Sequence, residues 1–156
     1  MHPFPHRYAV SAMAGPASVV TLRSAELEDI QSTAPPEFGG PAGNWSPETL
    51  FVAAIADCYI LSFRSVANAS KLEWSEIDCD AVGVLEKTTE GLWFPVIELA
   101  VTLRIPAGSD IARAERLLTS LTGGRALSQR TFVEITPHPH TVTLRSARLD
   151  ALLGLE

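Results

Sequence analysis

The stretch Ser46–Asn68, SPETLFVAAIADCYILSFRSVAN, decides the fold of this chain, because its pattern predicts one long helix. Ser46 is a good N-cap, Pro47 suits the first helical position, and Glu48 is an acid in the first turn, where the helix dipole favours negative charge. The predicted helix covers residues 47–68 and would be about 33 Å long. Apolar residues occur on nearly every side of it, and such a helix is buried all round. One small domain can scarcely cover that much surface, so we expect a partner subunit to cover part of it.

A segment rich in proline and glycine precedes the helix. Residues 34–47 read APPEFGGPAGNWSP, and such a stretch resists both helix and strand ladder. It could be a linker between domains. The segment before it is too short to be a domain, which favours an ordered loop.

Strand patterns on both sides of the helix predict an α+β domain. Two apolar, alternating stretches separated by a turn predict an N-terminal hairpin region over residues 8–33. Residues 76–87 and 92–105 also flank a turn, which predicts an antiparallel pair. The remaining predicted elements are a second helix that starts at Ser109–Asp110 and stops at Gly123–Gly124, and strand segments at 132–135 and 140–144. The order βββ-α-ββ-α-β indicates one α+β domain over residues 1–156, with antiparallel sheets around a long buried central helix.

Composition and charge exclude several classes of protein. The 156 residues carry a net charge of −6, which argues against a general nucleic-acid binder. The N-terminus lacks the apolar core of a signal peptide, and no run of about 18 apolar residues predicts a membrane span. We therefore expect a soluble, cytoplasmic protein without a cofactor. Two cysteines are too few for a disulfide scaffold, and His138 with His140 does not make a metal site, so no metal is expected.

Cys58 lies about three turns into the predicted helix and is the first candidate for chemistry. A free cysteine is a small apolar side chain that is commonly just buried. Asp57 beside it would raise the pKa of the thiol and disfavour the reactive thiolate. A reactive Cys58 therefore needs a cation supplied from elsewhere in the protein.

The residues around Cys58 carry a resemblance to a known family. The pattern P-E-F-G-G-P, followed by N-W-S-P-E-T-L-F-V-A-A-I-A-D-C, resembles the OsmC/Ohr family, the osmotically inducible protein C and organic hydroperoxide resistance proteins. In that family the peroxidatic cysteine follows the glutamate of the helix start by ten residues, and Glu48 and Cys58 have that spacing. The resemblance extends from about Tyr8 to Ser146.

The resemblance implies an intertwined homodimer with its active sites at the dimer interface. It implies that a cysteine thiolate attacks the O–O bond of an organic or lipid hydroperoxide and becomes a sulfenic acid. A second cysteine then forms a disulfide, which an external thiol or a lipoyl-type dithiol reduces. Ten residues of helix span about 15 Å, so Glu48 cannot touch the Cys58 of its own helix. If both serve one site, Glu48 comes from the other subunit; its simpler role is that of a first-turn helix acid.

Two residues depart from the family pattern. Ala17 stands where the family has an arginine that stabilises the thiolate, and Arg125 stands where it has the resolving cysteine. By the resemblance, the Arg125 guanidinium would lie near Cys58 and could lower the pKa of its thiol. Alternatively, Arg125 caps the end of the preceding helix.

The second cysteine and three aromatic residues complete the candidates. Cys79 alternates with acids in a predicted strand, which favours a packed residue over a substitute resolving thiol. Phe38, Trp45 and Phe51 could line a pocket for an apolar substrate.

Two functions remain open from the sequence. One is a thiol-dependent peroxidase that uses Cys58 and Glu48 and has no internal resolving cysteine. The other is a dimeric binding or stress protein of the same fold that has lost peroxidase activity, so whether the chain is an enzyme stays open. A thiol enzyme of another reaction class is a third possibility, because one fold hosts many functions.

Overall fold

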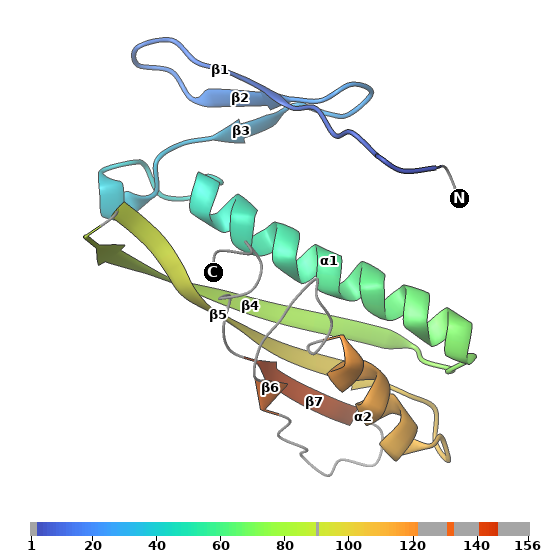
Figure 1. The fold of residues 1–156 in the computed structure, drawn as a ribbon. Helices are drawn as coiled ribbons and strands as arrows, with labels where there is room; N and C mark the ends of the chain where they lie inside the picture. The colour runs from blue at the N-terminus through green and yellow to red at the C-terminus, as the bar shows by residue number, and fades with distance from the viewer. Residues whose placement is uncertain (1–2, 90, 122–130, 133–140, 147–156) are drawn as a thin grey trace. The chain divides into compact units, whose positions relative to one another are not determined.

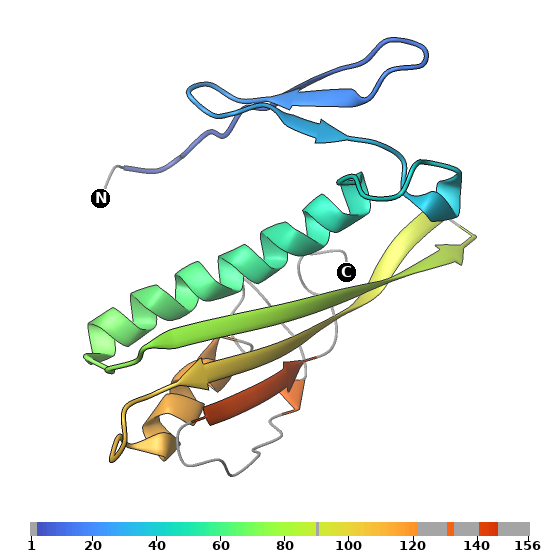
Figure 2. The ribbon, with the colours of Figure 1, turned by 180° about the vertical axis from the view of Figure 1, so that it is seen from behind.

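The structure, a computed structural model, describes residues 3–89, 91–121, 131–132 and 141–146. The chain forms two compact units, residues 1–51 and 52–156 (Figures 1 and 2). The first holds β1 (Ser11–Met13), β2 (Val20–Arg23), β3 (Ile30–Ser32), the short 3₁₀ helix η1 (Pro36–Phe38) and the start of α1 (Pro47–Ser70). The second holds the rest of α1, then β4 (Glu76–Thr88), β5 (Gly91–Arg104), α2 (Ile111–Ser120), β6 (Thr131–Phe132) and β7 (Thr141–Ser146). This is the mixed α+β content, with antiparallel sheets and one long helix, that the sequence predicts.

The first unit is built on a three-stranded antiparallel sheet in the order β1-β2-β3. It lies within the predicted hairpin region, and an exposed ion pair between Arg23 and Asp29 (2.9 Å) joins the end of β2 to the turn before β3. The proline-rich segment that follows is an ordered loop, as expected, although it also contains η1.

A reciprocal cap starts α1 where the sequence places it. The Ser46 Oγ accepts a hydrogen bond from the Thr49 backbone N–H (3.2 Å), and the Ser46 N–H donates to the Thr49 Oγ1 (2.8 Å). These bonds satisfy donors that a helix start leaves without partners. At the other end α1 runs two residues past the prediction, and the Arg113 guanidinium donates to the carbonyl of its last residue, Ser70.

The second unit is a four-stranded sheet in the order β4-β5-β7-β6, with α1 and α2 on one face. β4 and β5 form the long antiparallel hairpin that the sequence predicts. The inward side chains of β5, with Ile105 and one side of each helix, make the core: Ile55, Tyr59, Phe63, Ala67, Ile97, Leu99, Val101, Leu103, Ile105, Ala114 and Leu118. Ile77, Cys79 and Ala81 of β4 are partly buried against it. The strand predicted at 140–144 is confirmed by β7. Of the strand predicted at 132–135, only residue 132 is described, in β6, and residue 140 also lies outside the described residues.

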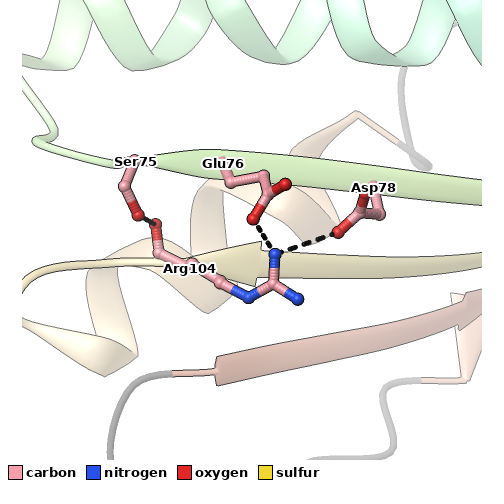
Figure 3. A network of polar contacts seen from close by, with 4 residues as sticks. All are labelled: Ser75, Glu76, Asp78 and Arg104. Atoms are coloured by element: carbon pink, nitrogen blue, oxygen red, sulfur yellow. Dashed lines mark hydrogen bonds and ion pairs between the residues drawn. The ribbon is translucent and has the colours of Figure 1, made fainter.

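The opposite face of the sheet carries charged and polar side chains at the open end of the β4–β5 hairpin, whereas the exposed Val82 and Val84 lie further along β4. Arg104 on β5 forms ion pairs with Glu76 and with Asp78 (3.4 Å) on β4, and the Ser75 hydroxyl donates to the Arg104 carbonyl (3.2 Å; Figure 3). Exposed pairs of this kind contribute about 0–1 kcal/mol each. Their effect is to favour one register of β4 against β5 at the open end of the hairpin, and they add little to the free energy of unfolding.

Within a single chain α1 is buried on one side only, and the expectation that a partner subunit covers the rest stays a prediction. Its inner side, with Ile55, Tyr59, Phe63 and Ala67, packs in the core, whereas Cys58 and Leu61 are exposed. The physical reason is geometric, because one sheet and one short helix can cover only one side of a rod-like helix. By length and composition alone α1 could cross a membrane, with a mean hydropathy of 1.6, but core helices of water-soluble proteins meet the same criterion.

Candidate functional site

Cys58 lies on the exposed side of α1, opposite the core. Ala54, Cys58, Leu61 and Ser65 follow one another at spacings of four, three and four residues, and all four are exposed. Such spacing places side chains in one row along a helix. We call this row the outer stripe. In the single chain the Cys58 thiol is therefore exposed to solvent, and the apolar side chains of Ala54 and Leu61 lie one turn before and one turn after it.

Glu48 stands in the first turn of the same helix. Its Oε2 atom is buried and has no hydrogen-bond partner among the described residues. A buried carboxylate oxygen without a donor costs free energy, on the order of 1–3 kcal/mol or more. The Glu48 Oε2 atom could therefore accept a hydrogen bond from an N–H group, or pair with a cation, of another molecule.

Cys79 is packed, as the sequence favours. It lies on β4 facing α1 and contacts the edge of the core. Burial, followed by the nearby Asp80 carboxylate, raises the pKa of its thiol from 9.0 to about 11. At neutral pH it is almost entirely protonated, and it lies on the inner side of α1 whereas Cys58 lies on the outer side.

The hairpin turn itself contains no arginine among the described residues. Ala17 occupies an exposed turn between β1 and β2, and Arg23 at the end of β2 is already paired with Asp29. Arg125, the other sequence-based candidate, lies outside the described residues, as do His138 and His140.

The three aromatic candidates all belong to the first unit. Phe38 ends η1, Trp45 lies near the end of the proline- and glycine-rich loop and Phe51 lies in the second turn of α1, and each is exposed. The backbone of Trp45 is fixed, because its carbonyl accepts from the Thr33 N–H (2.9 Å). The exposed rings of all three could contact an apolar molecule in solution, and the predicted pocket stays a prediction.

Sequence reasoning missed two features beside the thiol. The outer stripe could have been found from the spacing of Ala54 and Leu61 around Cys58, had the helix not been assumed buried on every side. Nothing in the sequence distinguishes Tyr59 from an ordinary core position, yet its hydroxyl donates to the Leu118 carbonyl in α2 (3.2 Å). Within the described part of the chain, no group of three His, Cys, Asp or Glu residues could hold a metal ion.

Solved structures share this architecture. An OsmC-like protein of unknown function from Vibrio cholerae is 20% identical, covering 76% of this chain and 89% of its own, with a TM-score of 0.66. An organic hydroperoxide resistance protein from Elizabethkingia anophelis is 18% identical over 78% of this chain and 85% of its own, with a TM-score of 0.64. At these identities the likeness shows the fold.

A third solved structure is closer in sequence. An organic hydroperoxide resistance protein OsmC from Legionella pneumophila is 27% identical, covering 78% of this chain and 85% of its own, with a TM-score of 0.57. None of the curated proteins matches the chain. The family of OsmC-like proteins matches residues 40–123, which is more than half of the 156 residues. This segment contains two of the three loop glycines, Gly40 and Gly43, with the capped helix start, Glu48 and Cys58, and the chain therefore belongs to the OsmC-like protein family.

Proposed function

We propose that the protein is a thiol-dependent reductase of organic or lipid hydroperoxides, with Cys58 as the peroxidatic thiol. The single observation that carries the proposal is the exposure of Cys58 on the outer stripe of α1, ten residues after Glu48. Family membership supports a redox and stress role, and several solved relatives are described as organic hydroperoxide resistance proteins. The apolar flanks of the thiol suit an alkyl or acyl hydroperoxide better than hydrogen peroxide.

The proposed chemistry needs only the thiol, the peroxide and an external reductant. The Cys58 thiolate attacks the terminal oxygen of R–O–O–H, the O–O bond breaks, and the alkoxide leaves and takes up a proton to give the alcohol. Cys58 is then a sulfenic acid. An external thiol condenses with it, releases water and forms a mixed disulfide, which a second thiol reduces. Cys79 takes no part in the proposed cycle, and its packing against the core and its raised pKa support this.

The supporting groups come from a second copy in this proposal. Glu48 and Cys58 of one helix are about 15 Å apart along the axis, so the two meet only if the chains form a homodimer with the site at the interface. The partnerless Glu48 Oε2 supports an incomplete site of this kind. Arg125 supplies the cation that stabilises the thiolate, and Phe38, Trp45 and Phe51 contact the organic part of the substrate. The dimer acts in the cytoplasm.

Hydroperoxide consumption tests the proposal. Cumene hydroperoxide is followed with dithiothreitol or dihydrolipoamide as reductant, for wild type, Cys58→Ser and the matched control Cys79→Ser. We expect loss of turnover in Cys58→Ser alone. Equal activity in wild type and Cys58→Ser would end the peroxidase proposal.

The second candidate function is a dimeric binding or stress protein without peroxidase activity. It is favoured by Ala17 in the hairpin turn and by the engagement of Arg23 with Asp29. In the same assay it predicts that wild type is as inactive as Cys58→Ser with either reductant.

A further inference from the structure

A cation lies close to the candidate thiol on the exposed side of α1. Cys58, Leu61 and Arg64 follow one another at spacings of three residues, and all three are exposed. Because α1 is one unbroken helix (Figure 1), residues three positions apart are neighbours, with about 5–6 Å between their Cβ atoms. The three side chains therefore form one row in the order thiol, apolar group and guanidinium. We call it the Cys58–Arg64 row.

Arg64 is the one basic residue of α1, and it has no partner within the described part of the chain. Its side chain takes part in none of the ion pairs or side-chain hydrogen bonds that the described residues form. Asp57 precedes it by seven residues, about 10 Å along the helix axis, which is too far for an ion pair. An arginine side chain stays charged throughout the working range of pH, so this guanidinium can bind an anion from outside the chain.

The two ends of the Cys58–Arg64 row differ in charge. Asp57 comes directly before Cys58, is exposed and likewise has no partner among the described residues. Negative charge therefore lies beside the thiol, and positive charge lies beyond Leu61. An anionic group is repelled from the first end and attracted to the second. A molecule with one reactive end and one carboxylate end is thus favoured in a single orientation along the row.

We propose that Arg64 is a substrate-binding residue that selects hydroperoxides with a carboxylate at the far end of an alkyl chain. The inference rests on the proposed function and narrows its substrate class. The peroxide group lies at Cys58, the alkyl chain contacts Leu61, which is 51% exposed, and the carboxylate pairs with the Arg64 guanidinium, which can hold both of its oxygens. Six residues of helix separate the two ends by about 9 Å along the axis. The acyl chain of a fatty-acid hydroperoxide spans such a distance.

Two substrates that differ by one charge test the proposal. They are linoleic acid hydroperoxide and its methyl ester, each used below its micelle concentration with dithiothreitol as reductant. We expect wild type to prefer the acid in kcat/KM. The preference should fall about three- to fivefold in Arg64→Gln, as for the loss of an exposed ion pair, and mainly through KM. Arg64→Lys should retain part of it, and salt at about 0.5 M should weaken it in wild type but not in Arg64→Gln.

An arginine elsewhere on the second unit serves as the matched control. Arg116 is exposed on α2 and does not belong to the Cys58–Arg64 row. Arg116→Gln removes the same charge from the protein as Arg64→Gln. It should leave the preference for the acid over the ester unchanged.

Protection of the thiol gives a second measurement that needs no turnover. In chains that carry Cys79→Ser, so that one thiol reports, linoleate and methyl linoleate compete with iodoacetamide for Cys58. Neither compound contains a peroxide. Linoleate should slow the alkylation more than the ester does, and this difference should disappear when Arg64→Gln is added.

The outcomes separate this inference from the proposed function. The same preference in wild type and Arg64→Gln, or an equal loss in Arg116→Gln, overturns the role of Arg64 and leaves the proposed function in place. If wild type and Cys58→Ser consume hydroperoxide equally, the proposed function fails, and the hydroperoxide substrate fails with it. Thiol protection then still decides whether the row binds a carboxylate, because equal protection by acid and ester would overturn that as well.

Discussion

Gly83 on β4 lies where the Val52 side chain of α1 approaches the sheet closely. A Cβ atom at this position would lie 2.6 Å from Val52 Cγ2 and 2.9 Å from Phe94 Cε1. Side-chain carbons do not approach this closely, so Gly83→Ala forces either the helix or both neighbouring side chains to move. We expect the substitution to lower the free energy of unfolding.

Two opposing effects set the size of this loss. Overpacking a core with one extra carbon costs typically about 1–3 kcal/mol. Replacing glycine by alanine restricts the unfolded chain and returns about 0.4–1 kcal/mol. The midpoints of the two ranges, about 2 and about 0.7 kcal/mol, leave an expected net loss of about 1.3 kcal/mol.

Urea unfolding at one fixed protein concentration measures the effect. The midpoint should fall in Gly83→Ala while the slope of the transition stays unchanged, because the surface exposed on unfolding is the same. Val52→Ala removes the nearest methyl group, so Gly83→Ala should cost less in that background, with a coupling of about 0.5–2 kcal/mol. A Gly83→Ala chain as stable as wild type, or an equal cost in both backgrounds, would refute the close approach of Val52 to Gly83.

Three further outcomes are expected from the cysteines and the helix cap. At pH 8 a disulfide reagent should label Cys58 rapidly and Cys79 only after denaturation, because a pKa of about 11 leaves roughly 0.1% thiolate; two rapidly labelled thiols would contradict the packing of Cys79. Between pH 9 and 11 the unfolded chain loses the Cys79 proton while the folded chain keeps it, so this contribution to the free energy of unfolding is full below pH 9 and falls as pH rises. The fall should be smaller in Cys79→Ala, and parallel curves of stability against pH for wild type and Cys79→Ala would contradict the raised pKa. Ser46→Ala should cost about 1 kcal/mol in urea unfolding and Ser46→Asp much less, because only the aspartate can still accept from the Thr49 N–H; equal losses would argue against the cap.

The sequence predicts the elements of this fold well, because its signals are local. Ser46 and Pro47 place the start of α1, and alternation in 76–87 and 92–105 places the long hairpin close to its observed bounds. The family assignment follows from the same local region. Glu48 and Cys58 are recognisable because their spacing along one helix is a property of the sequence alone.

Features that depend on packing between distant elements could not be predicted. Apolar residues surround α1, so the sequence contains no preferred face, and only the sheet decides that Tyr59 faces inward and Cys58 outward. The bond from Tyr59 to Leu118 joins residues 59 positions apart. The need for glycine at position 83 likewise arises from the contact with Val52 of α1, which the sequence does not reveal.

The loop over residues 34–47 has a composition that usually marks a site of proteolytic cleavage. Its two ends are nevertheless tied, by a bridge between Ser32 and Trp45 and by the hydrogen bond from Thr33 to Trp45. Within it, a Cβ at Gly40 would lie 1.7 Å from the Ala34 carbonyl oxygen, so the chain folds back on itself too tightly for any other residue. A protease needs an extended, pliable segment, and this loop offers neither property. Shortened versions of the protein should therefore keep residues 32–46 intact. A cut in this segment would separate the two ends that the contacts of Ser32 and Thr33 with Trp45 hold together.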